Sequence, residues 1–432
     1  MTRSRLGLWA SERLFWRPFS RHRPLLYAIA AVAFVWRRLL LRTTFIAITG
    51  SLGKTTAKEC LATILGARFS TVKSDANRNS GLGVCMSVLR VRPWHRVAVL
   101  EVAGAAPRQL MRSARLVRPD VAIVLNVLRT HTTAFATLAE HAAEKLRLLE
   151  SLRPGGLAIL HGDDPLVAAM PTPPEVRVRY FGTSAAYDLW ADQASSRWPA
   201  RLSFRVHRGT DSALVETQLV GTHWLPSVLA ALAAADSCGM SLHEAAAAAR
   251  RAVPFPARLE PVRLPSGATV LRDDYNAAVD TLEAARRVLE EAQAPRRLFV
   301  VNDFSDLGKN RKHRLRRLAV EAARCSEVAL FIGENAAYGR RRAIDAGMSP
   351  DSAHDFPSLA AAARFLASEL RSGDLMLLKG RTTDHAARVL FAQLGEVGCW
   401  KAYCRKTTLC DNCWELAHRP RERHGALGSA AG

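Results

Sequence analysis

The sequence has little lysine and an excess of basic over acidic residues. Only nine of its 61 basic residues are lysine, and the 39 acidic residues leave a formal net charge of +22. An amine can lose its proton in a protein and a guanidinium cannot, so the few lysines are candidates for chemistry that arginine cannot perform. Aromatic residues make up 7% of the chain, and no basic-aromatic module typical of nucleic-acid binding accompanies the charge. We therefore expect no nucleic-acid partner. The charge favours an anionic substrate or an anionic membrane surface.

Long apolar runs are also missing from the N-terminal segment, residues 1–44. Its one apolar run, residues 24–36, has 13 residues, whereas a membrane-spanning helix needs about 20. No small-residue cleavage site follows, which disfavours a secretory signal peptide. Arginines flank the run, and Trp9, Trp16 and Trp36 lie in the segment, a pattern typical of helices on a membrane surface. Three alternatives remain open: a helix packed on the next domain, a peripheral membrane contact through residues 1–44, and a transmembrane helix.

Cysteine is sparse in most of the chain and clustered near the C-terminus. Four of the eight cysteines are isolated in apolar contexts, as is typical of buried thiols in a reducing compartment such as the cytoplasm. Cys399, Cys404, Cys410 and Cys413 instead follow the spacing C-x4-C-x5-C-x2-C. Four thiolates at this spacing can surround a structural Zn²⁺, although the loop between the pairs is shorter than in ordinary zinc ribbons. Free or redox-active thiols and an iron–sulfur cluster are the alternatives.

Short apolar strands alternate with helical patterns in two long regions, which predicts a doubly wound, mostly parallel sheet in each. We therefore predict an α/β protein with four parts: a short basic and apolar N-terminal segment with a helix (1–44), a central P-loop domain (45–255), a Rossmann-like C-terminal domain (256–395) and a Cys-rich tail (396–432). A small antiparallel patch is expected within residues 185–220. The other predicted strands include residues 46–48, 97–104, 120–127, 155–164, 268–275, 296–304, 327–334 and 374–380, and the predicted helices include residues 54–65, 138–152, 281–292, 313–324 and 359–371.

An apolar strand, a glycine loop and a helix follow one another in "FIAITGSLGKTTAKE", residues 45–59. Only two residues separate Gly50 from Gly53, whereas the usual phosphate loop has four. The glycines let backbone N–H groups face an anion without obstruction by a Cβ, and the helix adds the positive end of its dipole. Lys54 would reach the β- and γ-phosphates, and the Thr55 hydroxyl would bind Mg²⁺. The predicted phosphate-binding residues are Gly50, Ser51, Gly53, Lys54, Thr55 and Thr56.

The shortened loop resembles the ATP loop of the Mur ligases, the ADP-forming amide ligases of peptidoglycan precursor synthesis and their relatives. Further segments resemble motifs of that family in the same order along residues 45–390. Members of the type that adds D-alanyl-D-alanine match best. The segments are "SDANRNSGLGV", "VLEVAG", "LNVLRTH", "HAAEKLRLLESL", "LRDDYNAAVDTLEAA" and "LLKGRTTD".

The resemblance implies which residues form the site. It places ATP between the central and last domains. Lys145 falls where the family carries a carbamylated lysine that bridges Mg²⁺, and a carbamate needs an amine that can deprotonate. The implied Mg²⁺ ligands are Thr55, Glu101, His131 and Lys145. The implied catalytic residues are Lys54, His131 and Lys145, and Arg258, Asp274 and Asn276 are expected to contact the nucleotide.

The resemblance also implies the reaction. A carboxylate substrate would attack the γ-phosphate of ATP to give an acyl phosphate and ADP, and an amino-acid or peptide amine would then displace phosphate. A cell-wall, capsule or peptide-like product is expected, made in the cytoplasm, with the inner face of the membrane as the alternative place of synthesis. Peptidoglycan-type members carry a separate N-terminal domain for the UDP-sugar, whereas 44 residues precede the ATP strand here. The alternatives are the D-alanyl-D-alanine-adding step itself and a non-catalytic ATP-binding partner subunit.

Overall fold

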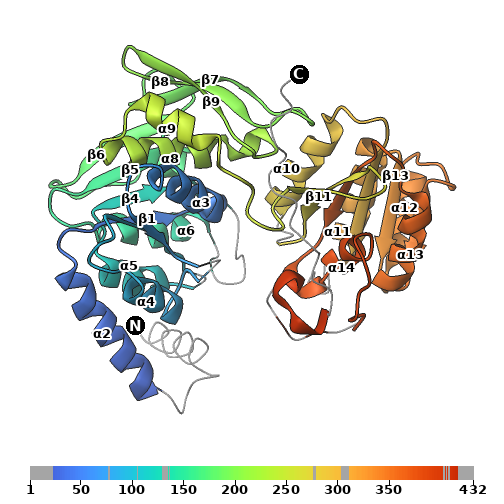
Figure 1. The fold of residues 1–432 in the computed structure, drawn as a ribbon, viewed down its shortest axis with the longest axis horizontal. Coiled ribbons are helices and arrows are strands. Elements are labelled where there is room, and N and C mark those ends of the chain that lie inside the picture. The colour runs from blue at the N-terminus through green and yellow to red at the C-terminus, as the bar shows by residue number, and fades with distance from the viewer. Residues whose placement is uncertain are drawn as a thin grey trace. The chain divides into compact units, whose positions relative to one another are not determined.

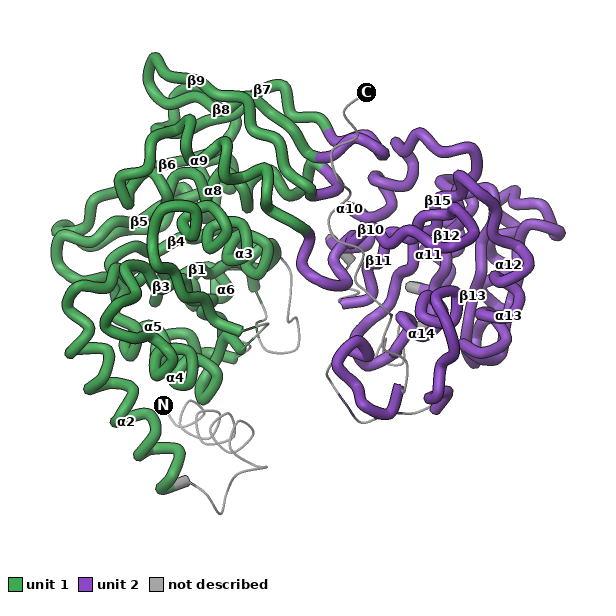
Figure 2. Tube along the Cα trace, in the orientation of Figure 1, with its two compact units in different colours: residues 1–195, 202–218, 222–253 green, residues 196–201, 219–221, 254–432 purple. Residues whose placement is uncertain are grey.

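The computed structural model contains two compact units (Figure 2). Unit 1 comprises residues 1–195, 202–218 and 222–253, and unit 2 comprises residues 196–201, 219–221 and 254–432. Two predicted site residues, His131 and Asn276, lie outside the part of the chain that the structure describes. The described residues are 23–75, 78–104, 106–128, 135, 137–275, 279–302, 311–401, 404, 406 and 409–416.

Unit 1 is built on a nine-stranded sheet in the order β2-β3-β1-β4-β5-β6-β7-β8-β9 (Figure 1). Neighbouring strands from β2 to β7 run parallel, whereas β7, β8 and β9 form the predicted antiparallel patch. β1 is buried almost throughout, which explains its continuous apolar run. The strands are β1 (Thr44–Thr49), β2 (Thr71–Lys73), β3 (Val97–Glu101), β4 (Val121–Val124), β5 (Leu157–His161), β6 (Arg177–Gly182), β7 (Leu189–Ser195), β8 (Ser203–Arg208) and β9 (Asp211–Glu216).

Helices of unit 1 bury apolar stripes against this sheet. One buried cluster joins Phe45 of β1 to Ala33 of α2, Val88 of α4, Ala114 of α5 and Leu148 of α6. α3 and α8 pack on each other and also against strands of the same sheet. The helices are α2 (Arg23–Leu39), α3 (Lys54–Leu65), α4 (Leu82–Leu89), α5 (Gln109–Val117), α6 (Leu138–Leu149), α7 (Pro165–Ala168), α8 (Leu225–Ser237) and α9 (Leu242–Ala249), with a 3₁₀ turn at Thr222–Trp224.

The N-terminal apolar run forms helix α2, and its inner face packs on unit 1. Leu26 and Ala33 are buried there. The Arg37 guanidinium fixes the C-terminal end of α2, since it donates hydrogen bonds to the carbonyl oxygens of Val117 at 2.6 Å and Arg118 at 2.8 Å. Of the three alternatives for this segment, a helix packed on the next domain is therefore the one that the structure shows. Among the described residues, no helix has the length and apolar character that crossing a membrane requires.

Unit 2 holds a six-stranded sheet in the order β10-β11-β15-β12-β13-β14, parallel except for β10. Parallel sheets with packed helices in both units confirm the predicted α/β class. The strands are β10 (Glu260–Arg263), β11 (Thr269–Asp273), β12 (Arg297–Asn302), β13 (Val328–Ile332), β14 (Ala353–Phe356) and β15 (Leu375–Lys379). The helices are α10 (Val279–Glu290), α11 (Arg311–Cys325), α12 (Ala336–Asp345), α13 (Leu359–Glu369) and α14 (Ala387–Phe391), with 3₁₀ turns at Thr382–Asp384, Cys410–Asn412 and Trp414–Leu416.

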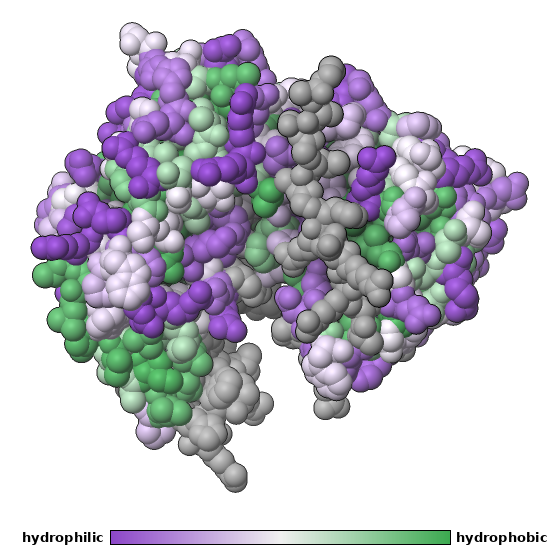
Figure 3. All heavy atoms as spheres, viewed as in Figure 1, coloured by the Kyte–Doolittle hydropathy of each residue, from purple (hydrophilic) through white to green (hydrophobic). Residues whose placement is uncertain are grey.

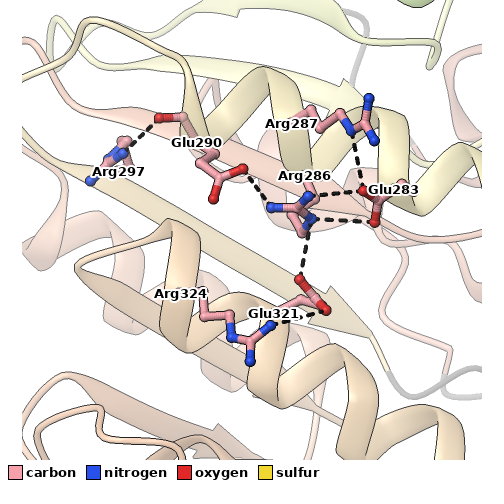
Figure 4. Close-up of polar contacts among 7 residues, drawn as sticks. All are labelled: Glu283, Arg286, Arg287, Glu290, Arg297, Glu321 and Arg324. Carbon is pink, nitrogen blue, oxygen red and sulfur yellow. Dashed lines mark hydrogen bonds and ion pairs between the residues drawn. The ribbon is translucent and has the colours of Figure 1, made fainter.

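An ionic network joins α10 to α11 on unit 2 (Figure 4). Arg286 of α10 lies 2.9 Å from Glu283 and 2.5 Å from Glu290 on its own helix, and 3.2 Å from Glu321 on α11. Its side chain is 14% exposed, while Glu283 and Glu290 are more open to solvent. We expect such partly exposed pairs to contribute little individually, and to matter mainly because one arginine connects two helices.

Candidate active site

The glycine loop follows the C-terminal end of β1, where parallel α/β sheets commonly bind ligands. Gly53 has a φ of 82°, and a Cβ there would lie 2.6 Å from the Ser227 hydroxyl oxygen. A Cβ on Gly50 would lie 2.9 Å from the Cβ of Leu125. Both positions therefore require glycine. Gly53 is also the N-cap of α3 and has no side chain to bond the first N–H groups, which remain available to an anion.

Asn126 fixes this loop, although sequence reasoning did not select it as a site residue. Its Oδ1 accepts hydrogen bonds from the N–H groups of Ser51 and Leu52, each at 2.9 Å, and its Nδ2 donates to the Leu52 carbonyl at 3.2 Å. The Ser51 hydroxyl accepts a bond from the N–H of Leu128 at 2.8 Å. The segment after β4 thus holds the loop that follows the adjacent strand β1. The available signal was a polar residue near the C-terminal end of a predicted apolar strand.

Lys54 folds over the loop. Its ammonium donates to the carbonyl oxygens of Gly50 at 2.7 Å and Ser51 at 3.0 Å. The two carbonyl oxygens accept hydrogen bonds from the Lys54 ammonium, as phosphate oxygens would. The Thr56 hydroxyl is buried and has no hydrogen-bond partner within the described residues. The six predicted phosphate-binding residues therefore lie together around one loop and one helix start.

Thr55 and Glu101, two predicted magnesium ligands, are in direct contact. The Thr55 hydroxyl donates to Glu101 Oε2 at 2.9 Å, and Asn79 Nδ2 donates to Oε1 at 2.8 Å. Glu101 ends β3 and is 2% exposed, and the parallel register sets it beside Ile48 of β1. A carboxylate and a hydroxyl are oxygen ligands of the kind that suits Mg²⁺.

Lys145 projects from α6 and is 6% exposed. Burial, followed by the nearby charge of Lys54, lowers the pKa of its ammonium to about 7. Much of this amine is therefore neutral near pH 7, which is the form that can add CO₂. The adjacent Glu144 is engaged elsewhere, since its carboxylate accepts bonds from the N–H groups of Arg108 at 2.8 Å and Leu110 at 2.9 Å. Within the described residues, Lys145 forms no ion pair.

The metal prediction fits the described residues only in part. They contain no group of three His, Cys, Asp or Glu side chains that could hold a metal ion. A search for those four residue types does not count the Thr55 hydroxyl or a carbamate on Lys145. His131 lies outside the described part. The contact between Thr55 and Glu101 is thus the part of the predicted Mg²⁺ set that the structure brings together.

In unit 2 a buried ion pair joins two motif residues. Lys379 ends β15 and is fully buried, and its ammonium pairs with Asp273 at the end of the neighbouring β11. It also donates to the Thr281 hydroxyl at 3.3 Å. Two residues later, Arg381 makes two bonds to Asp384, at 3.0 and 3.1 Å. The neighbouring ends of β11 and β15 are therefore held together by charge.

Asp274 follows β11 and is 2% exposed. Its Oδ1 accepts a hydrogen bond from Arg272 Nε at 2.7 Å. The same guanidinium donates two parallel bonds to Asp411, at 2.6 and 2.7 Å, so a residue of the C-terminal tail reaches this site strand. Burial raises the pKa of Asp274, and the charge of Arg272 opposes that rise. Sequence reasoning selected Asp274, but neither Arg272 nor Asp411.

Arg258 lies in a strained segment of unit 2. Its guanidinium carbon is 4.5 Å from the ring centroid of Tyr275, and its buried Nε has no hydrogen-bond partner in the described part of the chain. The flanking residues Ala257 and Leu259 have φ angles of 62° and 49°. Strain of this kind is commonly held at ligand sites and hinges. Asn276, which is also expected to contact the nucleotide, lies outside the described residues.

The tail cysteines do not form the predicted four-thiolate arrangement within the described residues. The Cys410 thiol lies 3.3 Å from His385 Nδ1, and the Cys413 thiol lies 3.4 Å from the Lys406 ammonium. Burial raises the pKa of Cys410 to about 11, which opposes a free thiolate. Cys399 is buried and Cys404 partly exposed, and all four are free thiols. Zinc at Cys399, Cys404, Cys410 and Cys413 remains a prediction without support from this geometry.

Comparison with known proteins matches both units to one family. Residues 48–235 match the Mur ligase middle domain, and residues 257–382 match the Mur ligase glutamate ligase domain. A UDP-N-acetylmuramoyl-tripeptide–D-alanyl-D-alanine ligase from Mycobacterium tuberculosis is 29% identical over 376 residues, covering 82% of this chain and 74% of the relative. The enzyme of that name from Escherichia coli K12 is 31% identical over 274 residues, covering 63% of this chain and 60% of the relative.

Solved structures show the same fold. A crystal structure of MurF from Acinetobacter baumannii superposes with a TM-score of 0.78 at 24% identity, over 84% of this chain and 79% of that one. MurF ligase from Thermotoga maritima in complex with ADP superposes with a TM-score of 0.73 at 21% identity, over 85% and 83%. With both of its domains matched in order along the sequence, the chain belongs to the Mur ligase family of ATP-dependent, amide-forming ligases.

Proposed function

We propose that the protein joins the carboxylate of a cell-envelope peptide precursor to an amino-acid or dipeptide amine, with ATP cleaved to ADP and phosphate. One observation carries the proposal. The phosphate loop, the contact between Thr55 and Glu101, and the low-pKa amine of Lys145 all belong to unit 1, in the domain that matches the Mur ligase middle domain. A general nucleotide-binding fold would explain the loop, but it would not require a buried lysine of lowered pKa.

In this proposal the loop and α3 hold the phosphates of ATP. The N–H groups of the loop and Lys54 would neutralise charge on the γ-phosphoryl group as it moves to the substrate carboxylate. Mg²⁺, when bound with ATP, supplies further charge neutralisation and orients the phosphates. Thr55 and Glu101 would hold it through oxygen, with His131 as a further ligand implied by the family. The amine then attacks the activated carbonyl carbon and phosphate leaves.

Lys145 would act as a carbamate. The ammonium first loses a proton, and the neutral amine then adds CO₂ and releases a second proton, so that the cation beside Lys54 becomes an anion. That change removes the repulsion with Lys54 that lowers the pKa of the amine. It also adds two oxygen atoms suited to Mg²⁺. In unit 2, Arg258, Asp274 and Asn276 are the residues that we assign to the nucleotide side of the site.

The names of the relatives guide the choice of substrates. The curated relatives act on a UDP-N-acetylmuramoyl-tripeptide and D-alanyl-D-alanine. We therefore propose a peptide carboxylate of this chemical class as the acid and D-alanyl-D-alanine as the first amine to test. The reaction would take place in the cytoplasm, where ATP is available. The N-terminal segment would bring the enzyme to the inner face of the membrane.

Phosphate release tests the proposal. Purified protein with ATP and Mg²⁺ is assayed with each acid, each amine and each pair, and products are weighed by mass spectrometry. We expect phosphate release only when both an acid and an amine are present, together with an amide product. Phosphate release without an amide would reject the ligase. Tight ATP-analogue binding with no turnover on any pair would favour the non-catalytic subunit instead.

A further inference from the structure

The outer face of α2 is apolar and open to solvent. Leu25, Val32, Val35 and Leu39 lie on one side of the helix, and their exposed fractions range from 56% to 66%. They face away from the buried stripe that packs on α4 and α5. More than half of the exposed large apolar side chains in the described residues lie between residues 25 and 41. Figure 3 shows this apolar surface as a green area over α2.

Positive charge surrounds this apolar face. α2 packs against α4 and α5, and none of these three helices contains an acidic residue. Between residues 76 and 119 the only acidic residue is Glu101, which is buried in the site. That stretch carries eight arginines, all of them exposed: Arg78, Arg90, Arg92, Arg96, Arg108, Arg112, Arg115 and Arg118. Trp94 is also exposed beside the end of α4, at 68%.

We propose that this surface, the outer face of α2 with the arginines of α5 and of the loops that flank α4 and α5, docks on an anionic lipid bilayer. Apolar helix faces that insert at the headgroup level bind more strongly when basic residues contact anionic lipids, because either signal alone gives weak attachment. A partner protein would need carboxylates around its apolar patch. A second copy of this chain would place the same arginines against one another, which like charges oppose.

The sequence before α2 continues the same chemistry. Residues 1–22 contain five arginines and one histidine, and Glu12 is their only acidic residue. The aromatic residues Trp9, Phe15, Trp16 and Phe19 lie among them. Tryptophan favours the boundary between lipid and water. The inference does not depend on the ligase reaction, since it concerns a surface of unit 1 formed by α2, α4 and α5.

Vesicle co-sedimentation of the full chain tests this surface. One set of vesicles contains phosphatidylglycerol and phosphatidylethanolamine, and the other contains phosphatidylcholine alone. We expect the full chain to bind the anionic vesicles. Binding should be at least tenfold weaker with the neutral vesicles or in high salt. The double variant V32N/V35N should lower binding at least tenfold. The matched control L214N removes an apolar side chain that is 55% exposed on β9, and it should leave binding unchanged.

Several outcomes would overturn the proposal. They are the absence of vesicle binding, equal binding to both lipid sets, and full binding by V32N/V35N. A dimer of the wild type that V32N/V35N converts to a monomer would show that a second copy occupies the face. Leu41, 87% exposed just after α2, gives a second variant, L41N, if the double variant unfolds. Turnover measured without lipid shows separately whether the ligase proposal holds.

A second inference concerns the tail, and it rests on the proposed role of Asp274. Residues 409–416 pack on the rest of unit 2 through Cys410 and Leu416, which share a buried cluster with Phe391 of α14. Both terminal nitrogens of Arg272 donate hydrogen bonds to Asp411, and Nε of Arg272 donates to Asp274. Arg272 is 2% exposed and its guanidinium lies 5.3 Å from the Phe391 ring centroid. Planar, two-point contacts of this kind fix the orientation of arginine.

We infer that Asp411 is a positioning residue, which orients Arg272 and through it the Asp274 carboxylate of the nucleotide side. If the tail were only a structural cover, loss of its charge would reduce the amount of active enzyme and leave KM unchanged. If Asp411 positions the site, the KM for ATP changes in the enzyme that remains folded.

Steady-state kinetics of Asp411→Asn, Asp411→Glu and Glu415→Gln separate these roles. We expect Asp411→Asn to raise the KM for ATP about tenfold, and Asp411→Glu to restore most of it. Glu415→Gln is the matched control, because Glu415 lies on the same segment and, among the described residues, forms its ion pairs with the exposed Lys401 and the partly exposed Lys406. An unchanged KM in Asp411→Asn, in a preparation whose wild type turns over, would overturn the inference. A wild type without turnover would reject the proposed function, and the inference with it.

Discussion

The two units use a buried lysine in opposite ways. Lys145 in unit 1 is buried without an ion pair among the described residues, and its pKa falls to about 7. Lys379 in unit 2 is buried at least as deeply, but its ammonium pairs with Asp273 and bonds to Thr281. Burial disfavours a charge unless a partner compensates it. The comparison teaches that burial alone does not define a reactive lysine, since the partner decides whether the amine stays charged.

The largest expected effect concerns the reactive lysine. Lys145→Ala should lower turnover at least 1,000-fold, because it removes the amine that would become a carbamate. Formate or acetate in the assay should restore part of the activity, since a small carboxylate can take the place of the carbamate oxygens. Lys73→Ala is the control, because Lys73 is exposed and pairs with Glu59 at the surface. Full turnover in Lys145→Ala would show that Lys145 is not part of the active site.

The next prediction concerns the paired lysine. Lys379→Met should destabilise unit 2 by about 3–5 kcal/mol, because it leaves the Asp273 carboxylate buried without its partner. Thermal and urea unfolding measure this loss. The double variant Lys379→Met with Asp273→Asn should recover a large part of it, since no unpaired charge remains. A single variant as stable as wild type would show that the pair is not buried in solution.

Replacing the buried lysine of unit 1 by methionine should have the opposite effect on stability. The pKa of Lys145 is about 7 in the folded chain and 10.5 in an unfolded one, so the unfolded chain binds more protons between these values and stability rises with pH there. Lys145→Met removes this cost and should stabilise unit 1 by about 1–4 kcal/mol near pH 7 in CO₂-free buffer. The gain should shrink toward pH 10. Lys58→Met is a contrasting control, because the buried Lys58 ammonium pairs with Glu59 and bonds to the Ser74 carbonyl, and its loss should destabilise.

The smallest effect concerns the ionic network of α10 and α11. Arg286→Ala should cost roughly 1 kcal/mol of stability, because partly exposed ion pairs are screened by water and salt. The cost should fall further in high salt, which unfolding at two salt concentrations would measure. A loss as large as that of Lys379→Met would mean that the network is buried far more than its exposed fractions indicate.

Sequence reasoning located the elements with strong patterns. The predicted helix at residues 54–65 matches α3, and the central strands β1, β3, β4 and β15 lie within or across their predicted runs. Short edge strands such as β2 and β14 were missed, because three or four residues carry too little pattern to separate them from loops. The apolar content of the N-terminal run did not distinguish a packed helix from a membrane contact, since α2 shows an apolar inner and an apolar outer face.

The site was predictable where the residue type itself limits the chemistry. The glycines and Lys54 follow from the geometry of a phosphate loop, while the roles of Glu101 and Lys145 came from resemblance to a family. The pair of Arg272 and Asp411 was not predictable, because 139 residues separate the partners and no local pattern links them. The contact between Cys410 and His385 was missed for the same reason, as the cysteine spacing drew attention to thiols alone.

Transfer of labelled oxygen tests the central claim most directly. The acid substrate is prepared with ¹⁸O in its carboxylate, and the phosphate released during amide formation is analysed by mass spectrometry. Because the carboxylate oxygen attacks phosphorus and leaves with it when the amine displaces phosphate, we predict one ¹⁸O in each phosphate released. Phosphate that carries no ¹⁸O from the acid, or that takes its new oxygen from water, would contradict the account of this protein as an amide ligase.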